Sequence, residues 1–450
     1  MNAASKPPRT SRLARGAIAG GALARAGVAR LSQKAQDLAR DEAQRAAARA
    51  AHEAELGRIL FGALNQLKGV ALKAAQLLSC EAQLLPEALR EQLARACYQA
   101  TPMNQALVGK RMRQALGPDW AERFAHFEPQ AFAAASLGQV HRARLADGCE
   151  LALKLQYPGI AATVASDMRL LRGLLLGPLS GLALGEGALP DAALLGRVLD
   201  EIEAGLAAEL DYAQEARAMD EFRAALAPRL PRLAVPEVCH ELSTPQLLAM
   251  QALPGLHLAE WLAGGPGQAE RDRYGQLIFD AFMVMVFELG RLHADPHPGN
   301  YLFMPDGRLG LLDFGCTRAL PRAFVTNLAR AWSAGLAPDG DAALREAYLA
   351  LGLIDAGLDL DHFRRELRPA LAPLLDWQLA PFRVPMFDFG ARAPLPHLDA
   401  AQQRQAMRHL HGMPPELPYL DRAFLGLNQL LARLGARVRT RNPWIGGDGP

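Results

Sequence analysis

Two short strings in the second half of the chain constrain its fold more than any other feature. The first is His-Ala-Asp-Pro-His-Pro-Gly-Asn at residues 293–300, and the second is Leu-Leu-Asp-Phe-Gly at residues 311–315. Two prolines and a glycine make the first string a rigid loop. It carries Asp295 and Asn300 five residues apart, and Asp313 follows Asn300 after 13 residues. Because the second string reads as an apolar strand that ends in aspartate, the pattern predicts carboxylate and amide oxygens placed to hold Mg²⁺.

An alanine-rich stretch and a lysine precede these strings. Residues 133–140 read Ala-Ala-Ala-Ser-Leu-Gly-Gln-Val, the frame of a Gly-x-Gly-x-x-Gly-x-Val phosphate loop with alanine at the first two glycine positions. In such a loop, backbone N–H groups approach phosphates closely. Lys154 ends an apolar strand 14 residues after Val140 and would hold the α- and β-phosphates. The predicted nucleotide-binding residues here are Ala133, Ala134, Ala135, Ser136, Gly138, Val140 and Lys154.

The four elements occur in the order that a kinase-like phosphotransferase needs. In that arrangement Asp295 would orient or deprotonate the nucleophile, and Asn300 with Asp313 would hold the metal. Adenine would lie against the backbone near Gln251 and Leu253. Each element alone has a simpler interpretation, such as an alanine-rich packing surface or a strand-end lysine with a buried stem. Their order and spacing together favour the phosphotransferase.

The lysine needs a glutamate partner, and residues 209–215 offer candidates. This segment, Glu-Leu-Asp-Tyr-Ala-Gln-Glu, reads as part of one helix. Asp211 and Glu215 are four residues apart and would share a face, whereas Glu209 would point elsewhere. We therefore expect Glu215 to pair with Lys154. The alternative is a solvated acidic face.

Two further strings look similar to kinase motifs and are interpreted as chance matches. A second Asp-Phe-Gly at residues 388–390 follows prolines rather than a strand. Ala-Pro-Asp at residues 337–339 stands near the place of an Ala-Pro-Glu motif, but residues 321–336 have apolar side chains at helical spacing and predict a packed helix. The missing Ala-Pro-Glu argues against a protein substrate.

Composition excludes several classes of protein. The 450 residues include 49 Lys and Arg against 47 Asp and Glu, a net charge of +2, and half are hydrophobic. A disordered chain would have fewer apolar residues, and a nucleic-acid binder would be more basic. Five cysteines without Cys-x-x-Cys spacing favour reduced thiols over a disulfide frame or a zinc site. We expect no transmembrane helix, because no apolar stretch is long enough.

The first 36 residues carry seven basic side chains and no acidic one. This pattern leaves three alternatives: a disordered tail, a surface that contacts anionic lipid, or an organelle transit peptide. The whole chain predicts an α+β, two-lobed protein-kinase-like fold with a helical N-terminal extension and a largely helical C-lobe. Helical spacing predicts a helix at residues 105–116, and strand patterns predict a hairpin near residues 302–312. The expected parts are the tail at 1–36, the extension at 37–118, the N-lobe with its inserted helices at 119–253 and the C-lobe at 254–450.

Taken together, these residues resemble the UbiB/ADCK (AarF) family of atypical kinases over roughly residues 50–440. The resemblance rests on the alanine-rich loop followed by His141, the string at residues 295–300 and the segment at residues 209–215. Residues 72–79 are also similar to the family's Lys-x-Gly-Gln signature, with Ala75 in place of the glycine.

The resemblance implies that the extension folds over the place where a protein kinase binds its peptide. Lys73 and Gln76 would then face the nucleotide, and Glu209 with Asp211 would face the extension. The implied chemistry is hydrolysis of ATP, or phosphorylation of a small molecule, with ATP and Mg²⁺ as cofactors. It would support isoprenoid quinone (ubiquinone) biosynthesis or lipid homeostasis. The alternatives are a catalytically weak, nucleotide-gated pseudokinase that binds a lipid or a protein, and a conventional protein kinase.

The resemblance also implies partners and a location. The expected partners are ATP, a quinone-precursor lipid or other small molecule, an anionic membrane surface and quinone-biosynthesis proteins, with no nucleic acid. The expected location is the bacterial cytoplasm, peripheral at the inner membrane, or the mitochondrial matrix in a eukaryote.

Overall fold

The computed structural model describes residues 103–135, 137–176 and 192–446, together with the single residues Gly21, Arg25, Glu55, Ile59 and Ala74. This part of the chain divides into two compact units. The first unit holds the described residues up to Arg217 and the segment Val238–Ala252, and the second holds Ala218–Glu237 and the described residues from Leu253 onward. Helices and small sheets occur in both units, which confirms the predicted α+β class.

A five-stranded antiparallel sheet organises the first unit. Its order is β1-β3-β4-β6, and β2 pairs with the beginning of β3 while β1 pairs with its end. The turn between β3 and β4 contains Gly148, whose positive φ of 89° suits glycine. The strands are β1 (His126–Phe127), β2 (Ala133–Ala135), β3 (Gly138–Arg144), β4 (Glu150–Gln156) and β6 (Leu247–Gln251).

Strand β4 is buried on both faces, and its alternation separates an apolar face from a polar one. Leu151, Leu153 and Leu155 pack with the helix α5 (Gln105–Leu116) in one apolar cluster. Lys154 and Gln156 point to the opposite face because successive side chains alternate along a strand. The observed bounds of α5 confirm the predicted helix. Asn104 caps it by accepting the Leu107 N–H at 2.9 Å.

The alanine-rich stretch differs from its prediction as a loop. Ala133–Ala135 form the strand β2, which runs antiparallel to β3 with Ala135 opposite Gly138. The backbone of this stretch pairs with an edge of β3, so that the stretch becomes one arm of a tight hairpin.

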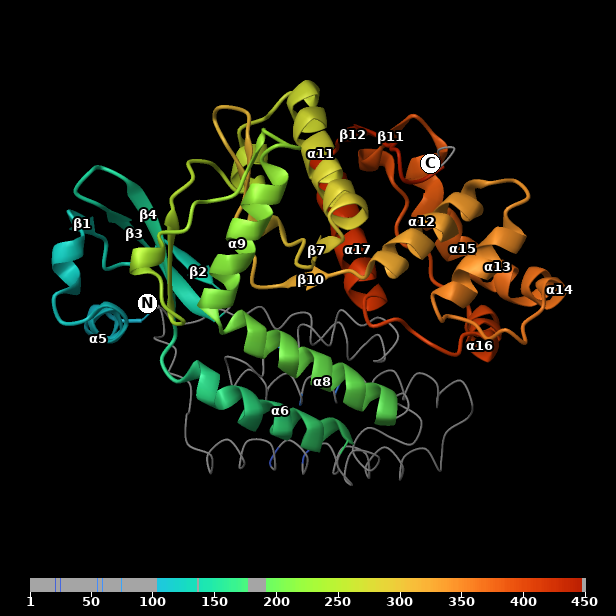
Figure 1. The fold of residues 1–450 in the computed structure, drawn as a ribbon, viewed down its shortest axis with the longest axis horizontal. Coiled ribbons are helices and arrows are strands. Elements are labelled where there is room, and N and C mark those ends of the chain that lie inside the picture. Colours follow the sequence, from blue (N-terminus) through green and yellow to red (C-terminus); the bar gives the residue numbers. More distant parts are fainter. Residues whose placement is uncertain are drawn as a thin grey trace. The chain divides into compact units, whose positions relative to one another are not determined.

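Three helices complete the first unit and lead into the second. α6 (Ile160–Leu176) and α8 (Ala192–Glu209) lie side by side, joined by Arg172, which pairs with Asp200 at 2.7 Å and with Glu203 at 2.9 Å (Figure 1). α9 (Tyr212–Leu226) follows directly and crosses the division between the units.

The prediction of one helix through residues 209–215 is wrong. α8 ends at Glu209 and α9 begins at Tyr212. Asp211 stands between them and accepts the N–H groups of Ala213 at 3.1 Å and Gln214 at 3.3 Å. Aspartate is favoured at such a helix start because its carboxylate satisfies N–H groups that have no partner inside the helix. Asp211 therefore caps α9, and its carbonyl accepts the Glu215 N–H at 3.1 Å.

Three small sheets lie in the second unit. β5 (Leu233–Ala234) pairs in parallel with β9 (Leu309–Leu311), and β8 (Tyr301–Phe303) pairs antiparallel with β9, which confirms the predicted hairpin. The other two sheets are antiparallel pairs. They are β7 (Arg291–His293) with β10 (Thr317–Ala319), and β11 (Met386–Asp388) with β12 (Arg437–Arg439).

The second Asp-Phe-Gly does follow a strand, contrary to the expectation. Asp388 ends β11, and the Gly390 N–H donates to its Oδ1 at 2.9 Å. Phe389 is buried in the core, and Asp388 pairs with Arg437 at 3.5 Å. The strand forms because β12 supplies a partner from about 50 residues away, which no local pattern reveals.

Helices make up most of the second unit. Trp332 stands in its aromatic core, with its ring centre 5.2 Å from that of Phe424 and 5.5 Å from that of Phe382. α11 (yellow) and α17 (red) pack together in Figure 1, and Phe282 contacts Phe424 between them at a centroid distance of 5.9 Å. The helices are α10 (Leu258–Ala263), α11 (Gln268–Met283), α12 (Arg322–Leu336), α13 (Asp341–Ala350), α14 (Leu360–His362), α15 (Arg368–Leu379), α16 (Ala400–His409) and α17 (Leu417–Leu434).

Shorter helical turns connect these elements. α12 confirms the packed helix predicted at residues 321–336. None of the helices in the described part of the chain is long and apolar enough to cross a membrane. The 3₁₀ turns are η1 (Trp120–Arg123), η2 (His240–Leu242), η4 (Pro298–Asn300), η6 (Ala380–Arg383) and η7 (Phe389–Ala391), and the π turns are η3 (Val284–Glu288) and η5 (Phe363–Leu367).

Candidate functional site

In the first unit, Lys154 of β4 meets Glu215 of α9. The Lys154 ammonium donates to Glu215 Oε1 at 2.8 Å and to Oε2 at 2.9 Å. The two side chains are only 8% and 1% exposed, so both charges are removed from water. The ring centre of Tyr212 lies 5.2 Å from the ammonium, within range of a cation–π interaction. The structure thus brings together the lysine and the glutamate that the sequence suggested.

A second residue of β4 holds the corner between α8 and α9. Gln156 is buried on the same face as Lys154 and donates from Nε2 to the Leu210 carbonyl at 2.9 Å. Its own carbonyl accepts from Arg111 Nε at 3.3 Å. The corner that begins α9 is therefore attached to β4 at Gln156, two residues beyond the attachment at Lys154.

Gly138 allows the hairpin of β2 and β3 to approach β4 closely. A Cβ atom at this position would lie 2.5 Å from the Leu155 carbonyl oxygen and 2.8 Å from the Tyr212 hydroxyl. No residue except glycine fits there without movement of the backbone. Tyr212 thus contacts both the hairpin and the ammonium of Lys154.

A buried polar chain lies next to Gly138 along β3. The Met103 N–H donates to Gln139 Oε1 at 2.8 Å, and Gln139 Nε2 lies 2.8 Å from His141 Nε2. His141 Nδ1 lies 3.0 Å from the Glu128 carbonyl, which can only accept. Nδ1 therefore carries the proton, and Nε2 accepts from Gln139. Burial lowers the pKa of His141, so the ring is held neutral.

In the second unit, the β8–β9 hairpin brings Asn300 and Asp313 to one end. Asn300 directly precedes β8, and the Leu312 N–H donates to its carbonyl at 3.0 Å. Asn300 Nδ2 donates to the Asp295 carbonyl at 2.9 Å and to Asp295 Oδ2 at 3.0 Å. These bonds set the orientation of the Asp295 carboxylate within the proline-rich loop.

The loop after β9 is hydrogen-bonded to the last residue of β7. The Gly315 N–H donates to Asp313 Oδ1 at 2.9 Å. His293 Nε2 lies against the Asp313 carbonyl and donates to it, since a carbonyl can only accept. Phe314 is buried between His293 and Phe222 of α9, with ring centroids 5.5 Å and 5.2 Å away.

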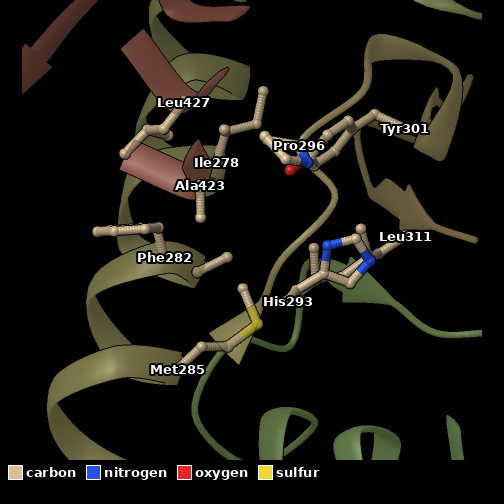
Figure 2. A pocket seen from close by; sticks show the side chains of 11 residues that line it. Ile278, Phe282, Met285, His293, Pro296, Tyr301, Leu311, Ala423 and Leu427 are labelled. Atoms are coloured by element: carbon tan, nitrogen blue, oxygen red, sulfur yellow. The ribbon is translucent and has the colours of Figure 1, made fainter. Parts of the chain in front are cut away.

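A small cavity lies beside the proline-rich loop that carries Pro296 (Figure 2). Side chains from α11 and α17 line it together with Pro296, Tyr301 and Leu311. Its volume is about 20 Å³, which leaves room for a single water molecule. His293 turns one ring nitrogen toward it in Figure 2, and within the described residues Nδ1 has no hydrogen-bond partner.

The donor set of this unit fits a hard cation. The Asn300 amide nitrogen is engaged with Asp295, so its Oδ1 is the end that can serve a metal. Asp313 adds a carboxylate. Mg²⁺ is commonly held by one or two such oxygens together with phosphate oxygens. Across the part of the chain that the structure describes, no three His, Cys, Asp or Glu side chains gather as a metal site.

The remaining predicted residues are placed only in part. Gln251 is exposed at the end of β6, opposite Leu151, and the adjacent Ala252 N–H donates to the Glu150 carbonyl at 2.9 Å. Leu253 begins the longer segment of the second unit, where its Cδ1 lies close to Gly310. Glu209 ends α8. Lys73, Ala75, Gln76 and Ser136 lie outside the described residues.

Three residues of the site were not predicted from the sequence: Gln139, Gln156 and Tyr212. Gln156 was detectable, because alternation along a strand places it on the same face as Lys154. Gln139 was detectable in the same way, because it stands two residues before His141 on β3 and therefore shares a face with it. Tyr212 carries no local signal, since its contacts with Gly138 and Lys154 depend on the turn between α8 and α9.

Comparisons with known proteins give consistent results. A family model described as the ABC1 atypical kinase-like domain matches residues 95–347. The chain is 30% identical over 388 residues to "Atypical kinase COQ8B, mitochondrial" of Rattus norvegicus, covering 84% of this chain and 69% of that protein. It is 29% identical over 381 residues to "Atypical kinase COQ8, mitochondrial" of Saccharomyces cerevisiae, covering 83% and 72%. Among solved structures, the complex of Rv3197 with erythromycin from Mycobacterium tuberculosis is similar, with a TM-score of 0.60 and 26% identity over 86% of this chain and 93% of that one.

Proposed function

Because the chain belongs to the ABC1 atypical kinase-like family, we propose that it binds Mg-ATP and either hydrolyses it or transfers its terminal phosphoryl group to a small molecule. The observation that carries the proposal is the buried, two-bond contact between Lys154 and Glu215. A lysine fixed in this way presents a cation at a defined position, which is what phosphate oxygens require. A lysine that served only to cover apolar surface would keep its ammonium in water.

The second unit supplies the groups for the metal and the nucleophile. Asn300 and Asp313 hold Mg²⁺, which neutralises the charge on the phosphates. Asp295, oriented by the Asn300 amide, positions a water molecule or a substrate hydroxyl. Little covalent chemistry is required of the protein in phosphoryl transfer, so rate depends on positioning and charge neutralisation.

The remaining residues complete the nucleotide site in this proposal. The backbone of the stretch at residues 133–138, with Val140, covers the phosphates, and adenine lies near Gln251 and Leu253. By the resemblance to the UbiB/ADCK family, Lys73 and Gln76 of the extension face the nucleotide. Glu209 and Asp211 face the extension.

The substrate class also follows from the resemblance. The acceptor, or the molecule whose handling is coupled to hydrolysis, is a quinone-precursor lipid or another small molecule. The protein supports ubiquinone biosynthesis or lipid homeostasis and works peripherally at an anionic membrane surface beside quinone-biosynthesis proteins. It does so at the bacterial inner membrane, or in the mitochondrial matrix if the chain is eukaryotic.

The chain contains its own matched control for the metal site. Asp388 ends the strand β11, and Asp313 stands two residues beyond the end of β9. Both precede Phe-Gly and accept the N–H of that glycine at 2.9 Å. Phosphate release from Mg-ATP is measured for the parent chain, Asp313→Asn and Asp388→Asn, with and without anionic vesicles and a quinone-precursor-like phenol. Asp313→Asn should abolish Mg-dependent turnover, and Asp388→Asn should retain it.

Two outcomes would change the proposal. Equal turnover in the parent chain and Asp313→Asn would remove Asp313 from the metal site. Thermal stabilisation by ATP without phosphate release under any condition would favour the second candidate function, a nucleotide-gated pseudokinase that binds a lipid or a protein.

A further inference from the structure

One face of α17 packs against both loops of the candidate metal site. Tyr419, Arg422 and Gly426 are spaced i, i+3 and i+7, so they share one face of the helix. Each of them contacts a residue of the segment Arg291–Ala319, which lies more than 100 positions earlier in the chain. These contacts lie within the second unit.

Arg422 joins the two loops through its guanidinium group. Its Nε donates to the Ala294 carbonyl at 3.1 Å, and its Nη2 donates to Cys316 Sγ at 3.3 Å. Ala294 directly precedes Asp295, and Cys316 directly follows the Asp-Phe-Gly string. The Ala294 N–H also donates to the Cys316 carbonyl at 2.8 Å. The guanidinium therefore adds a second connection between the two loops, next to the end of β7 and the beginning of β10.

Tyr419 supports the same pair of strands one helical turn earlier. Its ring centre lies 5.5 Å from the Arg422 guanidinium and 4.6 Å from that of Arg318 on β10. Arg318 Nη2 also donates to the Tyr419 hydroxyl at 3.1 Å. The ring thus lies within cation–π range of both guanidinium groups and helps to hold each of them in place.

Gly426 sets how closely the helix approaches the first loop. A Cβ atom at this position would lie 2.1 Å from Cγ of Pro296. Figure 2 shows Ala423 and Leu427 of the same helix beside the cavity that Pro296 also lines. The residue after Asp295 therefore rests directly on the backbone of α17.

We infer that Arg422 is a positioning residue for phosphoryl chemistry, because its guanidinium holds the loop of Asp295 and the loop of Asp313 at one spacing. The inference rests on the proposed function. Its physical basis is that a displacement of about 1 Å in a reacting group costs a rate factor on the order of 10². The string at residues 293–300 has the uncharged Ala294 between its histidine and its aspartate. The cation that contacts the backbone at this position comes from α17.

The test compares Arg422→Gln and Arg422→Lys with Arg433→Gln, which changes an exposed arginine of the same helix. Turnover is measured against ATP and against Mg²⁺, together with thermal unfolding. Amide hydrogen exchange is followed at residues 291–300 and 313–319. Arg422→Gln should lower kcat by roughly 10- to 100-fold, change the KM for ATP by less than about threefold and require more Mg²⁺. Exchange should accelerate in those two segments, and Arg433→Gln should match the parent chain in every measurement.

The lysine variant separates charge from geometry. Arg422→Lys keeps the cation but loses the planar fork that reaches two acceptors, so we expect partial recovery of kcat. Gly426→Ala should shift the Mg²⁺ dependence in the same direction through Pro296, with the guanidinium intact. An unchanged kcat and Mg²⁺ dependence in Arg422→Gln would overturn the inference. So would a loss of activity accompanied by faster exchange throughout the second unit, since that pattern indicates general destabilisation.

The experiment distinguishes failure of this inference from failure of the proposed function. If the parent chain neither binds Mg-ATP nor releases phosphate, the proposed function fails. Hydrogen exchange still decides in that case whether Arg422 positions the two loops, because the tie between Ala294 and Cys316 is a property of the fold. Equal exchange in the parent chain and Arg422→Gln would then overturn it.

Discussion

Both carboxylate oxygens of Glu215 accept hydrogen bonds from the Lys154 ammonium, at 2.8 Å and 2.9 Å, although 61 residues separate the two in the chain. The contact fixes α9 against β4 on the polar face of the strand. Together with the bond from Gln156 to the Leu210 carbonyl, it attaches the beginning of the helix at two points. The orientation of Lys154, for which we propose phosphate binding, therefore depends on the packing of this helix.

Removal of one partner of the pair should destabilise the protein strongly. Glu215→Gln leaves the buried ammonium without its counter-charge, at a cost of about 3–5 kcal/mol. The double variant Lys154→Met with Glu215→Leu removes both charges and should unfold within about 1–2 kcal/mol of the parent chain. Urea unfolding of the full chain measures both, and equal losses in the single and double variants would contradict the prediction.

Replacement of Asn300 should release Asp295. Asn300→Ala removes both bonds to Asp295 and one oxygen of the proposed metal site, so turnover should fall by a factor on the order of 10². Asn300→Asp keeps an oxygen for the metal but places a second negative charge beside Asp295. We expect it to bind Mg²⁺ and still lose most turnover, as measured by Mg²⁺ titration and phosphate release. Full activity in Asn300→Asp would show that the amide donor is dispensable.

A methyl group at Gly138 should disturb the β2–β3 hairpin, which we propose covers the phosphates. Gly138→Ala places Cβ 2.5 Å from the Leu155 carbonyl, and the backbone shift should cost about 1–3 kcal/mol and weaken ATP binding. Gly109→Ala is the control, because nothing lies within 4 Å of the new methyl group in the middle of α5. That change should stabilise the chain by about 0.5–1 kcal/mol. Chemical denaturation and ATP titration compare the two, and the prediction fails if both glycines behave alike.

His141 should make the stability of the first unit fall in mild acid. Burial lowers the folded-state pKa of His141 below its ordinary value of 6.5, whereas the bond to the Glu128 carbonyl and the Glu128 charge oppose this effect less strongly. The unfolded chain therefore binds a proton at a higher pH than the folded chain. The contribution to stability is complete above about pH 6.5 and is lost as the pH falls below this value toward the folded pKa.

The measurement is the free energy of unfolding between pH 7.5 and 5.5 for the parent chain and His141→Gln. The variant lacks the titrating ring, so the difference between the two should shrink as the pH falls. Parallel curves would show that His141 does not control this loss.

Residue types and short-range spacing correctly predicted several elements, the fold class and the family. The helix at residues 105–116, the hairpin near residues 302–312 and the α+β class followed from periodicity and turn residues, which act within one element. The order of the alanine-rich stretch, Lys154, the proline-rich loop and Asp-Phe-Gly indicated an atypical kinase, and the comparisons confirm that family.

Local patterns failed where a distant partner decides the conformation. The alanines at residues 133–135 form a strand because β3 offers an edge, and Met386–Asp388 form one because β12 does. Between α8 and α9, Asp211 ends a pattern that reads as continuous helix, since its side chain caps the second helix. These outcomes depend on which backbone groups find partners in the folded chain.

The sequence alone determined which candidate side chains for phosphate and metal chemistry are present, and in what order. Glu215 was expected as the partner of Lys154, but only the tertiary structure decided between this pair and a solvated acidic face. The tertiary structure also decided that the guanidinium beside Ala294 comes from Arg422, 128 residues later. Spacing along a helix or a strand predicts neighbours three or four positions apart. Contacts over these longer separations depend on how whole elements pack, and a local pattern carries no information about that packing.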